Sequence, residues 1–165
     1  MAKPTIHPQT TIGHVHLTVA DLDRAERFYT QMLGFEVTAR LGDEVVFMSA
    51  GGYHHHIALN VWEGKNAKPR PRGTTGLYHF AIRFPNRLEL AKVVQRLIDH
   101  EVKIDGASDH TVSEAIYLRD PDGNGIELYA DRERSEWFNR EGKLMMTTEP
   151  LDVDSLLDEL SAVNE

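Results

Sequence analysis

An internal repeat constrains the fold of this chain more than any other feature. Residues 14–33, HVHLTVADLDRAERFYTQML, align without gaps with residues 79–98, HFAIRFPNRLELAKVVQRLI, at an offset of 65 positions. Self-similarity at a fixed offset indicates copies of one supersecondary unit that bury their apolar faces against each other. The 165-residue chain is therefore expected to fold as two similar modules.

Each copy is predicted to begin with a strand and to continue with a helix. About six residues of alternating hydrophobicity come first, which is the pattern of a half-buried strand. Asp21 in the first copy and Asn86 in the second then stand where a side-chain oxygen can cap a helix. Gly34 occupies the position of a left-handed cap after the first helix. Helical spacing predicts two buried faces: Leu22, Ala25, Tyr29, Met32 and Leu33 in the first copy, and Leu90, Val93, Val94, Leu97 and Ile98 in the second.

Three short alternating runs follow each helix, so each half is predicted to be a βαβββ module. The turns AGGY and DPDGNG within the modules are rich in residues that tolerate positive φ. The expected fold class is α+β, with two repeated βαβββ modules that form a curved mixed sheet. We expect a single domain over residues 1–135, composed of module one (10–62), a linker (63–76) and module two (77–130).

Residues 136–165 are predicted to form a C-terminal tail with one amphipathic helix. Within residues 152–163 the apolar side chains share one helical face: Val153, Leu156, Leu157, Leu160 and Val163. We expect this helix to dock on the domain or on a second subunit.

The composition excludes several classes of protein. The chain has no cysteine, which excludes disulfides, zinc–thiolate sites and cysteine nucleophiles. The formal net charge of -8 argues against nucleic acid as a partner. No run approaches the roughly 18 apolar residues of a membrane span, so we expect a cytoplasmic protein that does not bind membranes. Nine histidines are many for such a chain, and histidine is the commonest side-chain metal ligand.

Strand periodicity predicts a metal site on one face of the sheet. Apolar residues alternate with His14 in the first strand, with His79 in its repeat and with Glu127 in the last strand, so these three side chains share the face opposite the core. The two histidines occupy the same position in the repeat. Two histidines and one carboxylate form the facial triad typical of non-haem Fe(II). We therefore expect the curved sheet to surround one metal site.

The sequence resembles a known superfamily. The segments HVHLTVADLDRAERFY, LYHFAI and YLRDPDGNGIELYAD are similar to those of the vicinal oxygen chelate superfamily, which includes glyoxalase I, bleomycin-resistance proteins, fosfomycin-resistance proteins and extradiol dioxygenases. The resemblance covers roughly residues 10–135, and its closest match is the Bacillus-type catechol 2,3-dioxygenase group. It implies a ring-cleaving dioxygenase that depends on Fe(II) and acts on a catechol-like aromatic diol and O2.

The resemblance also implies roles for individual residues. His55 stands three residues before Ala58, where extradiol dioxygenases carry a catalytic histidine that takes and returns protons. Tyr117 stands ten residues before Glu127, and His110 precedes it; these two side chains would hold the substrate oxygens. The strand HHHIALN lacks the second glutamate ligand of glyoxalases.

Several alternatives stay open at the level of sequence. Strand parity favours His56 over His55 in the cavity, unless a bulge at the GGY turn redirects the chain. A glyoxalase-like lyase or isomerase with Mn, Ni or Zn would take a fourth ligand from His54 or His56. A drug-binding protein without a metal is a third class. Many extradiol dioxygenases have four modules, so the substrate is undetermined, as is assembly into a homodimer or a higher oligomer.

Overall fold

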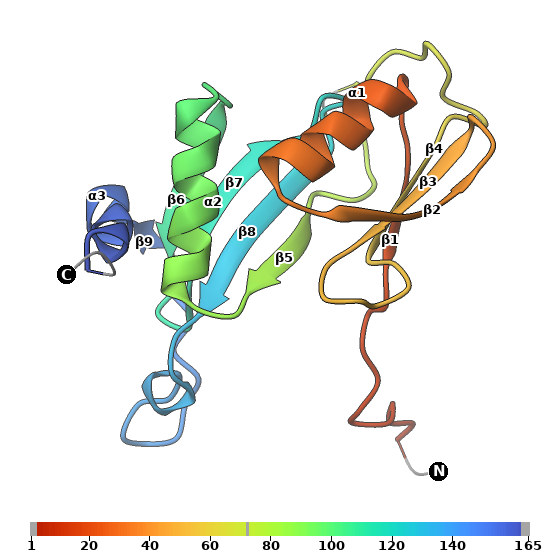
Figure 1. The fold of residues 1–165 in the computed structure, drawn as a ribbon. Coiled ribbons are helices and arrows are strands. Elements are labelled where there is room, and N and C mark those ends of the chain that lie inside the picture. Colours follow the sequence, from red (N-terminus) through yellow and green to blue (C-terminus); the bar gives the residue numbers. More distant parts are fainter. Residues whose placement is uncertain (1–2, 72, 163–165) are drawn as a thin grey trace.

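The computed structural model of the chain describes residues 3–71 and 73–162. They form two sheets, each with its own helix, and a C-terminal helical segment (Figure 1). The first module contains β1 (Val15–Thr18), α1 (Leu22–Arg27), a π-helical turn (Phe28–Met32), β2 (Glu36–Leu41), β3 (Val45–Ser49) and β4 (Ile57–Asn60). The second module contains β5 (Phe80–Phe84), α2 (Arg87–Asp99), β6 (Ile104–Asp109), β7 (Ser113–Arg119) and β8 (Gly125–Asp131). The tail adds short 3-10 turns (Arg134–Glu136 and Asp158–Leu160), β9 (Glu149–Pro150) and α3 (Val153–Leu157).

The sheet topology confirms the predicted repeat of βαβββ modules. The strand order is β1-β4-β3-β2 in the first sheet and β5-β8-β7-β6-β9 in the second. In both modules the first strand pairs in parallel with the last, and the other pairs are antiparallel. The curved surface is divided into two sheets: β1 and β5 are end strands, and each has one edge without a strand partner in the described part of the chain.

Local signals in the sequence set the bounds of the two main helices. Oδ1 of Asp21 accepts a hydrogen bond from the backbone N–H of Arg24, and Oδ1 of Asn86 accepts one from Glu89, each at 2.9 Å. Both predicted caps are thus confirmed. Gly34 has φ 87° and ends the first helical segment as predicted. The prediction that Ile98 is buried is wrong, because this residue lies at the last turn of α2 and is 41% exposed.

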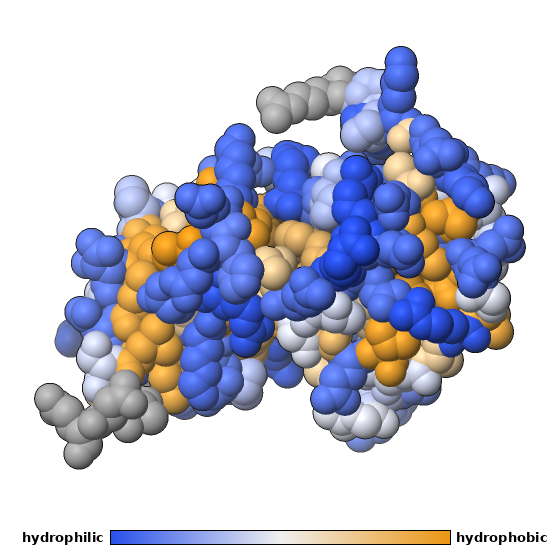
Figure 2. Space-filling model, turned by 45° about the horizontal axis from the view of Figure 1, so that its top comes forward, coloured by the Kyte–Doolittle hydropathy of each residue, from blue (hydrophilic) through white to orange (hydrophobic). Residues whose placement is uncertain are grey.

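The core lies between the helices and one face of each sheet. The predicted alternation is confirmed: Leu17 and Val19 are 7% and 1% exposed, while His16 in β1 and His14 just before it are exposed. The sheet face away from the helices is thus left for polar side chains. The face turned forward in Figure 2 is mostly hydrophilic with hydrophobic patches between the charged groups, as expected for a chain with 27% charged residues.

The two modules are joined by a set of hydrogen bonds that we call the turn clamp. The DPDGNG turn between β7 and β8 lies against α1, which Figure 1 shows above the start of β8. The Tyr29 hydroxyl donates to Oδ2 of Asp120 at 2.9 Å. Oδ1 of Asp122 accepts from the backbone N–H of Ala20 at 3.0 Å and from the Arg24 guanidinium at 2.8 Å. Because Tyr29 and Asp120 are 0% and 4% exposed, the clamp is buried and fixes how the modules sit.

The C-terminal helix docks on the domain, on the outer side of α2. Leu156 is fully buried there, and Val163 lies outside the described residues. A charged network supports this contact: Glu114 bridges Arg87 and Arg132 at 2.7 and 2.9 Å, and Arg87 also reaches Glu159 at 2.7 Å. Since Glu114 has a side chain only 9% exposed, the two guanidinium groups compensate the buried carboxylate.

Candidate metal site

Two of the three predicted metal ligands lie together on the open face of module two. His79 immediately precedes β5, and Glu127 is on β8 opposite Ala81, so the parallel pairing of the two strands brings the side chains together. His79 Nε2 is 3.0 Å from Glu127 Oε2. Two ligands about 2.1 Å from one cation and roughly at right angles are about 3 Å apart, so this pair has the spacing of neighbouring metal ligands.

Tyr117 and His110, to which the resemblance assigns the substrate oxygens, continue the cluster. Tyr117 on β7 is directly opposite Glu127, and its hydroxyl donates to Oε1 of Glu127 at 3.1 Å. His110 follows β6, and its Nε2 is 2.7 Å from the Tyr117 hydroxyl. The four side chains therefore form one connected chain along the sheet: His79, Glu127, Tyr117 and His110.

The tail fixes the orientation of the His110 ring. His110 Nδ1 is 2.7 Å from the backbone oxygen of Thr147. A carbonyl oxygen only accepts, so Nδ1 must carry a proton and donate. Nε2 of the neutral ring is then an acceptor that faces the Tyr117 hydroxyl. The sequence analysis missed Thr147, because a backbone carbonyl in an irregular tail leaves no residue signal.

The environment of Tyr117 keeps its hydroxyl protonated. Burial raises the pKa of Tyr117 to about 12, and the nearby Glu127 carboxylate contributes to the rise. The hydroxyl therefore remains a hydrogen-bond donor at neutral pH. It has one proton and two acceptors next to it, on Glu127 and His110.

A small cavity opens beside this cluster. It has a volume of about 220 Å³, and its lining includes His79 and Tyr117 together with Tyr78, Asp105 and Arg119. Arg119 is paired with Asp105 at 3.0 Å, so the cavity wall carries a compensated pair and no free charge. The volume suits one aromatic ring more than a large ligand.

The third predicted ligand, His14, lies in a separate cluster of aromatic rings in module one. The centre of its ring is 4.5 Å from that of His55, which in turn lies 5.1 Å from Phe47 and 4.5 Å from His54. Burial lowers the pKa of His55, and the neighbouring His14 and His54 lower it further. The neutral ring of His55 can thus accept a proton near pH 7.

The chain bends just before β4, and this bend decides how the three consecutive histidines lie. Gly51 and Gly52 have φ of 65° and 79°, as the AGGY turn predicts. Val15 pairs with Ile57 in the β1–β4 register, so His14 and His56 are the residues just before this pair. His56 Nδ1 is 2.9 Å from Ser49 Oγ. His55, which precedes the strand, reaches the His14 ring because of the bend.

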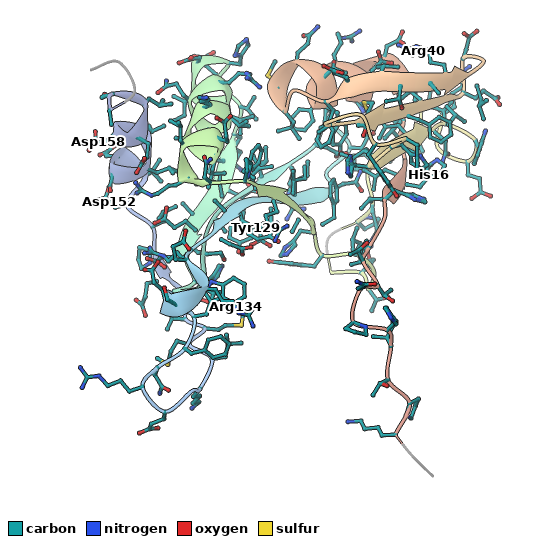
Figure 3. All side chains as sticks on the ribbon, turned by 60° about the horizontal axis from the view of Figure 1, so that its bottom comes forward. His16, Arg40, Tyr129, Arg134, Asp152 and Asp158 are labelled. Carbon is teal, nitrogen blue, oxygen red and sulfur yellow. The ribbon has the colours of Figure 1, made fainter. Side chains whose placement is uncertain are left out.

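The structure does not bring His14 to His79 and Glu127. Among residues 3–71 and 73–162, no group of three histidine, cysteine or acidic side chains is close enough to hold one metal ion. His14 and His79 instead line the same groove, of about 900 Å³, which includes residues from both β1 and β5. Figure 3 shows His16 on β1 and Tyr129 on β8 well apart, one in each module. The predicted ligand set is therefore only partly assembled within one described chain.

Comparison with known proteins gives consistent relatives. A model of the Glyoxalase/Bleomycin resistance protein/Dioxygenase superfamily matches residues 11–128. The chain is 46% identical over 157 residues to a catechol-2,3-dioxygenase of Bacillus subtilis (strain 168), covering 94% of this chain and 54% of that protein. It is 30% identical over 127 residues to biphenyl-2,3-diol 1,2-dioxygenase 3 of Rhodococcus globerulus, covering 77% and 65%. The chain thus spans between about half and two thirds of the length of these relatives.

Solved structures support the fold. A glyoxalase/dioxygenase from Nostoc punctiforme superposes with a TM-score of 0.64 at 18% identity, covering 81% of this chain and all of that one. A lactoylglutathione lyase from Agrobacterium tumefaciens gives 0.58 at 24% identity, covering 75% and 96%. None of the helices within the described residues is long and apolar enough to cross a membrane.

Proposed function

The chain belongs to the Glyoxalase/Bleomycin resistance protein/Dioxygenase superfamily, and we propose that it is an extradiol ring-cleaving dioxygenase that uses Fe(II) and O2 on a catechol-like diol. The observation that carries the proposal is the connected cluster of His79, Glu127, Tyr117 and His110 on the open face of module two. It offers two metal ligands beside two proton-holding groups, which is the combination that this chemistry requires.

The proposed iron ligands are His14, His79 and Glu127. His79 and Glu127 fit a shared cation, since their ligand atoms are 3.0 Å apart and face an accessible surface. His14 does not fit within the single chain, because it lies in the cluster of module one. The proposal of Fe(II) rests on the two-histidine, one-carboxylate set, which is typical of non-haem Fe(II) oxygenases.

Tyr117 and His110 are proposed to hold a proton next to the substrate oxygens. With Nδ1 committed to the Thr147 carbonyl, His110 Nε2 can accept a proton from the Tyr117 hydroxyl or from a substrate hydroxyl. Tyr117 can turn its single O–H toward a bound oxygen when Glu127 is engaged elsewhere. One such oriented donor is commonly worth about 100-fold in rate.

His55 is proposed to act as the proton-transfer group beside His14. Its lowered pKa leaves the imidazole neutral near pH 7, so it can take a proton from a catechol hydroxyl. Its contact with the His14 ring keeps it within reach of whatever His14 binds.

Oxygen uptake by the reconstituted protein tests the function. The chain is loaded anaerobically with Fe(II), catechol is added in an oxygen electrode, and absorbance is followed for a ring-opened product. We expect O2 consumption that disappears in His79→Ala and Glu127→Ala. His7→Ala and Glu63→Ala are matched controls, because both side chains are exposed and neither belongs to the proposed site, and they should retain full uptake.

The outcomes separate the proposal from its alternatives. Full turnover in Glu127→Ala would refute the assignment of the carboxylate ligand. Activity on a hemithioacetal with Ni or Zn, and none on diols with Fe(II), would identify a glyoxalase-like lyase instead.

A further inference from the structure

We propose that Thr111 and Thr147 are positioning residues that hold His110 with its proton on Nδ1 and so set the direction of the hydrogen bonds along the cluster. The inference rests on the proposed function, since His110 and Tyr117 are its proton-holding pair. The structure holds the His110 ring through several contacts at once, and most of them come from the C-terminal tail.

The turn that carries His110 has an unfavourable backbone conformation. His110, Thr111 and Val112 link β6 to β7, and Thr111 has φ 68°. Hairpin loops of three residues favour glycine at such a position, since a β-branched side chain is disfavoured at positive φ. Asp109 Oδ1 accepts a hydrogen bond from the Thr111 backbone N–H at 2.8 Å, and Asp109 is itself paired with Arg132 at 2.6 Å. A threonine at a position that favours glycine indicates a task for its side chain.

The Thr111 side chain contacts the tail at Thr147. Thr111 Oγ1 is 2.7 Å from Thr147 Oγ1, so the two hydroxyls share a hydrogen bond. The backbone of Thr147 adds two more contacts: its N–H donates to the His110 carbonyl at 3.2 Å, and its carbonyl accepts from His110 Nδ1 at 2.7 Å. Thr147 therefore holds the backbone of the turn, the His110 ring and the neighbouring hydroxyl together.

The tail is anchored just after Thr147, so the Thr147 carbonyl has a defined place. The strand β9 begins two residues later and pairs with the end of β6, and Figure 1 shows it next to α3. Leu156 of α3 is fully buried, and the Arg87 guanidinium donates to the Ser155 carbonyl at 2.9 Å. Such support matters, because a mobile carbonyl would leave the imidazole ring free to turn.

The tautomer of His110 decides which way the protons of the cluster point. With Nδ1–H donated to Thr147, Nε2 carries a lone pair and accepts from the Tyr117 hydroxyl at 2.7 Å. With the proton on Nε2 instead, His110 would donate to the Tyr117 oxygen, and Tyr117 would turn its single proton toward Glu127. Only the first arrangement leaves a base beside the proposed substrate oxygens. The two threonines thus act on the reaction through His110.

NMR of the histidine ring nitrogens tests the inference without relying on activity. The full chain is labelled with ¹⁵N-histidine, and its metal-free and Zn(II)-loaded forms, both diamagnetic, are recorded above the pKa of an ordinary imidazole. His110→Gln identifies the His110 signals by their absence. We expect a protonated Nδ1 and an unprotonated Nε2 in the wild type. Thr111→Gly combined with Thr147→Val should release this preference and raise the share of the Nε2–H form.

Controls separate positioning from folding. Thr147→Ser keeps the hydroxyl and should keep the wild-type tautomer. Thr5→Val with Thr10→Gly makes matched changes at exposed threonines and should leave the His110 signals unchanged. Because glycine adopts φ 68° without strain, Thr111→Gly should change stability in urea very little, although a purely structural residue would lose it. Circular dichroism checks that the variants fold, and Thr147→Val alone repeats the test with a smaller change.

Oxygen uptake by the Fe(II)-loaded chain with catechol links the tautomer to the reaction. We expect the double variant to lose up to about 100-fold in kcat with a smaller change in KM, as for a misplaced reacting group. A wild type with the proton on Nε2, or a double variant with the wild-type pattern, overturns the inference. Full kcat in a variant whose tautomer has changed does the same. A wild type with the Nδ1–H pattern but no oxygen uptake overturns the proposed function and leaves the positioning of the ring standing.

Discussion

Replacing Tyr29 by phenylalanine removes one hydroxyl group from the contact between the modules. Its proton is donated to Asp120 at 2.9 Å in a fully buried position. A hydrogen bond to a charged partner contributes about 1.5–3 kcal/mol. Asp120 keeps its three other donors, which are the backbone N–H of Asp122 and both the backbone and side-chain amides of Asn124. We therefore expect Tyr29→Phe to lower the free energy of unfolding by about 2 kcal/mol.

Urea denaturation at neutral pH measures this loss. With a slope of roughly 2 kcal/mol per molar urea, the midpoint should fall by about 1 M without a change in slope. Tyr53→Phe is the matched control, because Tyr53 is 44% exposed and its hydroxyl makes no hydrogen bond within the part of the chain that is described. The control should differ from the wild type by less than about 0.5 kcal/mol.

The pH dependence gives the same prediction a second readout. Burial, followed by the Asp120 charge and hydrogen bond, raises the pKa of Tyr29 well above its ordinary value of 10.0. The folded state then binds this proton more tightly than the unfolded state. The stabilisation is complete below pH 10 and is lost as pH rises from 10 toward the raised pKa. The difference in free energy of unfolding between the wild type and Tyr29→Phe should decrease by up to about 1.4 kcal/mol per pH unit in this window. An unchanged difference from pH 9 to 11, or equal stability at pH 7, would refute the reasoning.

Three further substitutions test other parts of the structure. Glu114→Ala leaves two partly exposed arginines without their shared carboxylate. It should lower the free energy of unfolding, measured by urea denaturation, by about 2–3 kcal/mol. A loss below about 1 kcal/mol would contradict the stabilising role of the charged network. Gly125→Ala forces a Cβ onto the Tyr78 oxygen and should cost about 1–3 kcal/mol, while Gly106→Ala, with open space around it, should change stability by less than about 1 kcal/mol. Tyr117→Phe should lower the rate of oxygen uptake by about 100-fold with an unchanged metal content, so full activity would remove its proposed role.

The sequence predicted what local forces decide. The helix caps at Asp21 and Asn86 were readable because capping needs only a side-chain oxygen three residues from an amide. The alternation in β1 and β8 was readable because a strand turns successive side chains to opposite faces. The prediction of a buried Ile98 was wrong because the helical spacing of apolar residues continues to the last turn of α2, even where no other element covers that turn.

The arrangement of the modules could not be predicted from the same signals. A repeat implies two similar units without specifying which surfaces meet. That choice depends on contacts such as Tyr29 with Asp120, which are 91 residues apart in sequence. His14, His79 and Glu127 each lie on the expected face of their own sheet. Whether these faces come together depends on how the modules are arranged, so the prediction that the three side chains share one face stays a prediction. The orientation of His55 depends on the backbone at Gly51 and Gly52, which parity counting along β4 does not include.

The turn before the last strand has a different task in each half of the molecule. In module two it is DPDGNG and joins the modules, whereas in module one it is AGGYHHH and carries the histidines. After duplication of an ancestral module, one copy of the turn could hold the fold together while the other was free to vary. Tolerance to mutation should therefore be unequal: residues 120–124 constrain folding, and residues 51–55 form the part of the repeat where new chemistry can evolve at little cost to the fold.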